Sequence, residues 1–221
     1  MLAAILFDLD GTLTNSDTLH FPIWQEFLRD YGLEIDQAFY RNRISGRLNP
    51  VLIRDLLPTL SAEAGQALAD RKEARFRKLS SQLQRLSGLT DILNWINTRG
   101  LKTAVVTNAP RDNAHLMLRS LHLEAAFDTV VISEDVGIGK PDPAPYQQAL
   151  RNLDVAPESA LAFEDSPSGV QAAVAAGIST VGIASTQDPQ VLYEPGAMLV
   201  VPDFTDPQLW DLLGAPKTTD V

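Results

Sequence analysis

The feature that most constrains the fold of this chain is its first dozen residues. Six apolar residues, 2–7, are followed directly by two aspartates, Asp8 and Asp10, and then by Gly11. A continuous apolar run of this kind is typical of a strand buried on both faces, as the strands of a parallel sheet are. Ligands of open α/β sheets bind at the carboxyl ends of the strands. The sequence therefore predicts a ligand site at Asp8 and Asp10.

The spacing of the two aspartates suits a shared site. Side chains two residues apart in an extended chain point the same way, and Gly11 then allows the chain to turn. Two carboxylates held close together repel each other, and a hard cation with oxygen ligands, such as Mg²⁺, relieves that repulsion. The motif alone leaves a simpler interpretation open, in which Asp8 and Asp10 only cap the following helix.

Composition narrows the class of partner. The 221 residues carry a formal net charge of -10, which argues against nucleic acid or an anionic membrane as partner. The chain has no cysteine, so disulfides, thiolate metal sites and a cysteine nucleophile are excluded. Asp8 interrupts the first apolar run too early for a signal peptide, and no run approaches the roughly 20 apolar residues of a membrane span. We expect a cytoplasmic protein, monomeric or weakly dimeric.

The hydrophobic pattern divides the chain into two parts. Residues 15–86 show no strand pattern and predict helices over 17–31, 36–43, 51–57 and from Ser61 onward. From residue 87, strands are predicted over 102–107, 129–132, 160–163, 180–183 and 198–201, with helices over 90–98, 113–121, 143–153 and 169–176. This alternation predicts an α/β fold, a doubly wound parallel Rossmann-like sheet formed by 1–14 and 87–221, with an inserted all-helical cap domain over 15–86.

Polar clusters follow four of the predicted strands. They are Asp8 with Asp10, Thr107-Asn108, Gly139-Lys140-Pro141-Asp142 and Glu164-Asp165-Ser166. In a parallel sheet all four lie along one carboxyl edge. Each cluster alone also fits a capping or surface role. Together they predict a site that attacks a phosphoryl group, in which an aspartate is the nucleophile, a second carboxylate moves a proton, and a metal and a lysine neutralise charge.

The order of these motifs resembles the haloacid dehalogenase-like (HAD) hydrolase superfamily across nearly the whole chain. The insertion resembles the helical cap of the phosphoglycolate phosphatase and β-phosphoglucomutase branch. The resemblance implies that Asp8 is the nucleophile and Asp10 the general acid and base. It also implies Mg²⁺ as cofactor, held by Asp8, the backbone carbonyl of Asp10 and Asp165, with Glu164 in support.

The same resemblance assigns further residues. The positions that match its phosphate-binding residues are Asp8, Gly11, Thr107, Asn108, Ala109 and Lys140, of which Thr107 and Lys140 also count as catalytic. It also implies a cis peptide bond between Lys140 and Pro141.

Candidate substrate contacts lie mostly in the insertion. His20 stands where many relatives carry a histidine that faces the active site, although a lone helical histidine is ordinarily a surface residue. Gly46 and Arg47 resemble the cap loop that reaches the substrate in the mutases. Arg111 follows the second motif and is a candidate contact to the leaving group. Two more cations, Arg43 and Lys72, are expected to be solvated charges on helix faces.

We therefore expect a Mg²⁺-dependent phosphatase that hydrolyses small phosphorylated metabolites, of phosphoglycolate or sugar phosphate type, through phospho-Asp8. One alternative is a sugar-phosphate mutase of β-phosphoglucomutase type. It is weakened because Ser45 and Asn49 occupy the positions where the mutases carry a lysine and an arginine. The other alternative is a phospho-aspartate signalling module, from which Asp10 distinguishes this chain because it would speed the attack of water.

Overall fold

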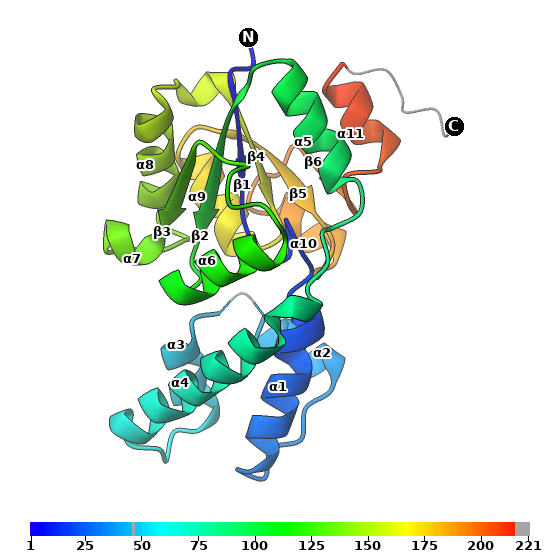
Figure 1. Ribbon diagram of the computed structural model, residues 1–221. Coiled ribbons are helices and arrows are strands. Elements are labelled where there is room, and N and C mark those ends of the chain that lie inside the picture. The colour runs from blue at the N-terminus through cyan, green and yellow to red at the C-terminus, as the bar shows by residue number, and fades with distance from the viewer. Residues whose placement is uncertain (46, 215–221) are drawn as a thin grey trace.

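A parallel sheet forms the centre of the protein. The computed structural model describes residues 1–45 and 47–214, and within them six strands run parallel in the order β3-β2-β1-β4-β5-β6 (Figure 1). The strands are β1 (Ala4–Phe7), β2 (Lys102–Thr107), β3 (Thr129–Ile132), β4 (Ala160–Glu164), β5 (Ser179–Ile183) and β6 (Leu199–Val201). The predicted fold class, a doubly wound parallel sheet, is confirmed.

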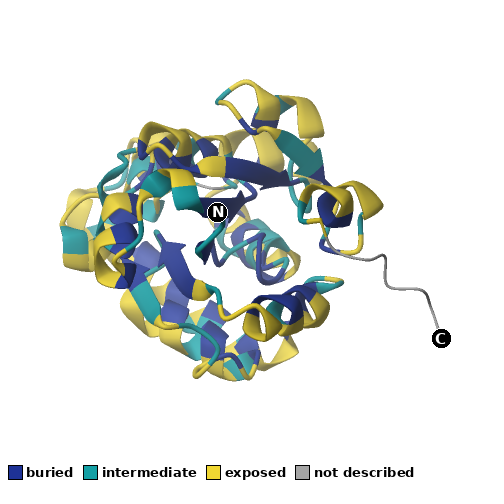
Figure 2. Ribbon diagram, turned by 90° about the horizontal axis from the view of Figure 1, so that it is seen from above, coloured by how far each residue is buried: buried dark blue, intermediate teal, exposed yellow. Residues whose placement is uncertain are grey.

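Helices cover both faces of this sheet. They are α5 (Leu89–Thr98), α6 (Arg111–Ser120), α7 (Ser133–Val136), α8 (Ala144–Leu153), α9 (Pro167–Ala175), α10 (Pro189–Tyr193) and α11 (Pro207–Leu212), with one 3₁₀ turn at Pro157–Ser159. Because side chains alternate along a strand, Ile5 and Phe7 of β1 join the hydrophobic cluster under α5, α6 and α11. Ala4 and Leu6 join the cluster under α8 and α9. The buried strands lie between exposed outer helix faces (Figure 2).

The second part of the chain is a group of four helices inserted between β1 and α5. These helices are α1 (Asp17–Arg29), α2 (Gln37–Arg43), α3 (Asn49–Leu56) and α4 (Ala62–Leu79), followed by a 3₁₀ turn at Ser80–Gln82. They bury a hydrophobic cluster of their own around Trp24, Leu28 and Leu52. Figure 1 shows them together beyond the end of the sheet at which β1 leads into α1. The insertion therefore lies over the carboxyl ends of the strands.

The termini of the inserted helices follow from local hydrogen bonds. The side chain of Asp36 accepts a hydrogen bond from the Phe39 amide at the start of α2. The hydroxyl of Ser61 accepts one from the Ala64 amide at the start of α4. Such side chains satisfy amide groups that a helix start leaves without intrahelical partners. The hydrogen bond of Ser61 therefore explains why α4 begins directly after this residue.

The short helices are where sequence and structure differ. Helices α7, α10 and α11 span only 4, 5 and 6 residues and are absent from the predicted set. Segments this short do not complete enough turns to show a hydrophobic period. Helix α3 begins at Asn49, two residues before the predicted start. None of the helices among the described residues has the length and apolar character needed to cross a membrane.

The aromatic cluster beside β1 gives a test of the fold. Phe7 is fully buried and contacts the rings of Phe163 and Phe204, with centroids 5.3 and 6.0 Å away. We expect Phe7→Ala to lower the free energy of unfolding by about 3–5 kcal/mol, because it removes buried area and leaves a cavity. Leu212→Ala, at an exposed position of α11, should cost less than about 1 kcal/mol. Equal costs in urea unfolding would contradict this assignment of the core.

Candidate active site

The centre of the site is a buried lysine between two carboxylates. The Nζ of Lys140 donates hydrogen bonds to Asp8 Oδ1 at 2.7 Å, to Glu164 Oε1 at 2.5 Å and to the carbonyl of Val106 at 2.7 Å. Asp8 follows β1, Val106 lies in β2 and Glu164 ends β4. The sheet order places these three strands side by side. The topology thus brings residues far apart in sequence to one point.

Burial shifts the pKa of Asp8 and that of Lys140 in one direction, and the opposite charge of the partner shifts each in the other direction. Burial, with the nearby Glu164 and Asp10, raises the pKa of Asp8 to about 7 against the opposing pull of Lys140. Burial alone would lower the pKa of Lys140, but the charges of Asp8 and Glu164 outweigh it and raise that pKa above its usual value. The lysine therefore stays charged. Lys140 contacts Asp8 through Oδ1, so Oδ2 is the oxygen of this carboxylate that is free to react.

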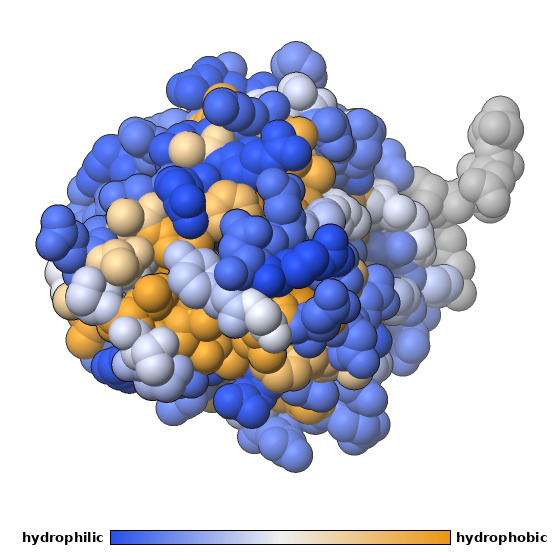
Figure 3. Space-filling view, turned by 90° about the horizontal axis from the view of Figure 1, so that it is seen from below, coloured by the Kyte–Doolittle hydropathy of each residue, from blue (hydrophilic) through white to orange (hydrophobic). Residues whose placement is uncertain are grey.

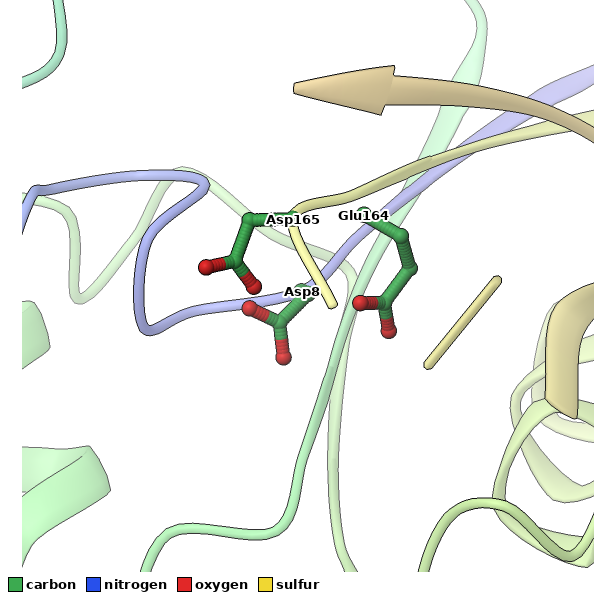
Figure 4. A group of neighbouring side chains, drawn as sticks. All are labelled: Asp8, Glu164 and Asp165. Carbon is green, nitrogen blue, oxygen red and sulfur yellow. The ribbon is translucent and has the colours of Figure 1, made fainter. Parts of the chain in front are cut away.

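Three carboxylates converge at the end of the sheet and form a candidate metal site. One oxygen from each of Asp8, Glu164 and Asp165 lies within 4.8 Å of the others (Figure 4). The Oδ2 of Asp8 is buried and has no hydrogen-bond partner among the described residues. Burial, followed by the charges of Asp8 and Glu164, raises the pKa of Asp165 well above its usual value. A divalent cation would relieve this repulsion, so the donor set fits Mg²⁺.

Gly11 makes the approach of the first loop to this cluster possible. Its φ is +83°, a conformation that side chains rarely adopt, and a Cβ built there would lie 1.8 Å from Oδ2 of Asp165. Only glycine therefore fits between the first motif and the fourth. This is the physical reason for the glycine that follows Asp10.

Asp10 lies beside the buried centre, and its side chain is part-exposed. It accepts a hydrogen bond from Ser16 Oγ at 2.6 Å, and His20 Nε2 lies 3.6 Å from its Oδ1. Burial alone would raise the pKa of Asp10, but the contact with His20, the Ser16 hydrogen bond and the charge of Lys72 together lower it. The His20 ring stacks on Phe76 with centroids 4.1 Å apart. His20 thus faces the site, as the resemblance implies.

Hydrogen bonds join the second motif, at Asn108, to the third, at Lys140. Asn108 Nδ2 donates to the carbonyl of Lys140 at 3.1 Å, and Asn108 Oδ1 accepts from the Lys140 amide at 3.0 Å. The Lys140–Pro141 bond is cis. Thr107 Oγ1 accepts from the Ala109 amide at 2.9 Å. The side chain of Asn108 therefore positions the lysine loop, while Thr107 and Ala109 form the turn beside it.

One large cavity joins the sheet edge to the helical insertion. Its volume is about 860 Å³. It is lined on the sheet side by Asp8, Asp10, Gly11, Thr107, Asn108, Ala109, Lys140 and Asp165, and on the helical side by His20, Arg47, Asn49, Lys72, Glu73 and Arg77. Glu164 is fully buried beneath this wall. The structure thus brings the residues of all four predicted motifs together at one cavity.

The remaining candidate contacts differ in their placement. Arg47 lines the cavity, and its guanidinium forms an ion pair with Asp55. Arg111 is exposed, pairs with Asp135 and is not among the residues that line the cavity, so we leave it out of the substrate contacts proposed below. Gly46 lies outside the described residues.

Lys72 corrects an expectation drawn from the sequence. It was expected to be a solvated charge, but only 3% of it is exposed, and its Nζ lies 2.8 Å from Glu73 Oε1. The ammonium also lies over the ring of Trp24, at 5.5 Å from its centroid. The many charges of α4 give it a polar sequence, and the burial of Lys72 arises from packing against Trp24 of α1 and Phe76 of α4 itself. Arg43, by contrast, is exposed as expected.

Several polar residues of the site have no signal in the sequence. The hydroxyl of Tyr146 donates to Glu164 Oε1 at 2.6 Å, and Thr186 Oγ1 donates to Asp165 Oδ2 at 2.7 Å. Tyr146 is buried in α8, where its spacing indicates only a core position. Ser16, Asn113 and Glu73 were likewise missed. Their contacts depend on elements that meet only in the folded protein.

The chain is similar to characterised enzymes over most of its length. It is 35% identical over 208 residues to the phosphorylated carbohydrates phosphatase of Thermotoga maritima, a match that covers 90% of this chain and 94% of that protein. It is 28% identical over 214 residues to the β-phosphoglucomutase of Bacillus subtilis, with 93% and 91% covered.

A solved structure and a family model agree with these sequence similarities. The crystal structure of CbbY from Rhodobacter sphaeroides in complex with phosphate superposes with a TM-score of 0.80 at 27% identity, and covers 92% of this chain and 95% of that one. The model that describes haloacid dehalogenase-like hydrolases matches residues 5–183. The resemblance inferred from the four motifs is confirmed, and the chain belongs to the haloacid dehalogenase-like hydrolase family.

Proposed function

We propose that the protein is a Mg²⁺-dependent phosphatase of phosphorylated carbohydrates that acts through a phospho-aspartyl intermediate on Asp8. The observation that carries the proposal is the state of the Asp8 carboxylate. Lys140 fixes one oxygen at 2.7 Å, and the other is buried without a hydrogen-bond partner among the described residues, in a residue that lines the cavity. The similarity to the Thermotoga maritima phosphatase supports the carbohydrate class.

In the first step, Oδ2 of Asp8 attacks the phosphorus and the bond from phosphorus to the leaving oxygen breaks. The carboxyl of Asp10 gives its proton to that oxygen, which leaves as a hydroxyl group. The contacts of Asp10 lower its pKa in the free enzyme. A phosphate dianion bound beside it acts in the opposite direction, because like charges disfavour ionisation. Substrate binding therefore favours the protonated form that this step requires.

In the second step, water attacks the phosphorus of phospho-Asp8. Asp10, now ionised, accepts a proton from this water, and the bond from phosphorus to Oδ2 breaks to release phosphate and regenerate Asp8. Ser16 and His20, which contact Asp10 at 2.6 and 3.6 Å, stabilise the ionised form needed at this stage. The same residue thus acts first as acid and then as base.

The cation site and Lys140 would together neutralise the negative charge of the transferred phosphoryl group. Asp8, Asp165 and the backbone carbonyl of Asp10 would hold Mg²⁺, which supplies positive charge for the transferred phosphoryl oxygens. Glu164 orients Lys140 through their contact at 2.5 Å, and Tyr146 supports Glu164 at 2.6 Å. Thr107 and the turn at Ala109 are proposed to contact the phosphate. We infer that residues 1–14 and 87–221 form this catalytic core.

The insertion, residues 15–86, is proposed to act as a cap over the cavity. A cap that closes on the substrate excludes bulk water during the first step and contacts the leaving group. Its candidate contacts are His20 and Arg47, which both line the cavity.

A sugar-phosphate mutase is the second candidate, because the chain is 28% identical to the Bacillus subtilis β-phosphoglucomutase. A mutase must bind a bisphosphate and therefore needs free positive charge on its cap. Three cations of the insertion line the cavity: Lys72 and Arg47 are each paired with a carboxylate, and Arg77 donates a hydrogen bond to Asn113. The phosphatase is therefore the better supported activity.

We expect Asp8→Asn to lower kcat by about 10³-fold or more, because it removes the nucleophile. Asp10→Asn should lower kcat by about 10²–10⁴-fold through the loss of proton transfer. Phosphate release from a phosphorylated carbohydrate measures both. Asp112→Asn, at an exposed position of α6 outside the cavity lining, is the matched control and should retain activity. An active Asp8→Asn protein would contradict covalent catalysis.

Chelation tests the cation site. Treatment with EDTA should silence the wild-type enzyme, and Mg²⁺ should restore it, because the convergent carboxylates repel without a cation. Thermal unfolding of the treated protein checks that the loss is not caused by unfolding. Full activity after thorough removal of metal would rule out the proposed cofactor.

The two enzyme candidates are separated by their products. With β-glucose 1-phosphate and a trace of glucose 1,6-bisphosphate, a phosphatase releases inorganic phosphate faster than it forms glucose 6-phosphate. We expect this result. Faster accumulation of glucose 6-phosphate would establish the mutase instead.

A further inference from the structure

A buried ion pair lies in the wall of the cavity, on the helical insertion. Lys72 and Glu73 are neighbours in α4, and the lysine Nζ lies 2.8 Å from Glu73 Oε1. Only 3% and 9% of the two residues is exposed. Both line the same cavity as Asp8 and Asp10. The pair therefore faces the space that the leaving group of a substrate would occupy.

Glu73 is held by groups from three helices. Its Oε1 accepts a hydrogen bond from Asn49 Nδ2 of α3 at 2.5 Å as well as from Lys72. Its Oε2 accepts one from Asn113 Nδ2 of α6, which belongs to the sheet-bearing part of the chain. Asn113 in turn accepts from Arg77 at 3.0 Å. The carboxylate is thus fixed in place rather than free to move away from Lys72.

The Glu73 carboxylate carries a full negative charge. Burial alone would raise its pKa, but the charge and hydrogen bond of Lys72, followed by His20 and Asn49, lower the pKa below its usual value. A buried lysine beside an ionised carboxylate forms a pair without net charge, which weakens its attraction for a second anion. The ammonium keeps hydrogen-bond donors that suit a hydroxyl group.

The helical wall of the cavity as a whole carries equal numbers of basic and acidic residues among those that the structure describes. Its charged residues among those the structure describes are Arg47, Lys72 and Arg77 against Asp17, Asp70 and Glu73. Arg47 is further paired with Asp55. Figure 3 shows the opposite side of the insertion, which points away from the sheet and carries hydrophobic residues among the hydrophilic ones. No excess positive charge awaits a second phosphate on the cavity wall.

We propose that Glu73 sets the charge class of the substrate: by neutralising Lys72 it restricts the enzyme to monophosphates with an uncharged, hydroxyl-bearing leaving group and excludes bisphosphates. This inference rests on the proposed phosphatase function. Whichever phosphate of a bisphosphate enters the core, the other must lie against the insertion. There its two negative charges meet a wall without net positive charge, and Glu73 itself repels them.

The test compares two substrates that differ by one phosphate, fructose 1-phosphate and fructose 1,6-bisphosphate. The wild-type enzyme should have a kcat/KM for the monophosphate about tenfold or more above that for the bisphosphate. Glu73→Gln keeps the size of the side chain and leaves Lys72 uncompensated. It should shift the ratio of the two kcat/KM values about tenfold toward the bisphosphate. A purely structural role for Glu73 would lower both values together and leave their ratio unchanged.

Two further variants make the result decisive. Glu63→Gln removes the same charge from an exposed position at the start of α4, outside the cavity lining, and should leave the ratio as in the wild type. Asp70→Asn removes an exposed carboxylate from the cavity wall and should shift the ratio in the same direction as Glu73→Gln, by less. It reports on the charge of the wall even if Glu73→Gln does not fold.

The inference is overturned if the wild-type enzyme hydrolyses the bisphosphate as efficiently as the monophosphate. It is also overturned if neither Glu73→Gln nor Asp70→Asn changes the ratio while phosphate release continues. Those outcomes leave the phosphatase function intact. A folded wild-type enzyme that releases phosphate from neither substrate, nor from other phosphorylated carbohydrates in the presence of Mg²⁺, would instead contradict the proposed function and the inference with it.

Discussion

The contact of Lys140 with Asp8 and Glu164 is the interaction on which the rest of the site depends. A lysine and two carboxylates are buried together, and their charges are tolerable only because each has a partner at hydrogen-bond distance. That arrangement requires β1 between β2 and β4, so that the ends of three parallel strands meet. The sheet therefore does more than build a core. It holds one carboxylate oxygen still and leaves the other free beside two further acids, which is what a nucleophile and a cation site both require.

The parallel sheet explains why so much of this edge was predictable. Apolar runs such as residues 2–7 indicate buried strands, and parallel strands must all present their carboxyl ends on one side. The polar residues that follow each run then have to converge. What the pattern did not specify is the partner of each side chain. Glu164 Oε1 accepts from both Lys140 and Tyr146, and the side chain of Asn108 holds the lysine loop. The roles of Glu164 beside the cation and of Asn108 at the phosphate stay predictions.

The helical insertion was less predictable for a physical reason. Its helices were visible from their periodicity and caps, but the environment of a charged residue on a helix depends on what packs against it. Lys72 lies in a strongly charged segment and was read as solvated, whereas packing against Trp24 and Phe76 buries it. Lys72 pairs with its neighbour in the sequence, Glu73, and Glu73 in turn accepts from Asn113 of α6, which is distant in sequence. Charge balance at the cavity is therefore a property of the fold, and substrate choice follows from it.

The central claim is that Asp8 carries a covalent phosphoryl group during turnover, and the most direct measurement is mass spectrometry of the enzyme after acid quenching in the presence of Mg²⁺ and a phosphorylated carbohydrate. The account predicts a fraction of the protein heavier by one phosphoryl group, with the added mass on the peptide that contains Asp8. A phosphoryl group on another residue, or none in rapidly quenched samples of an active enzyme, would contradict it.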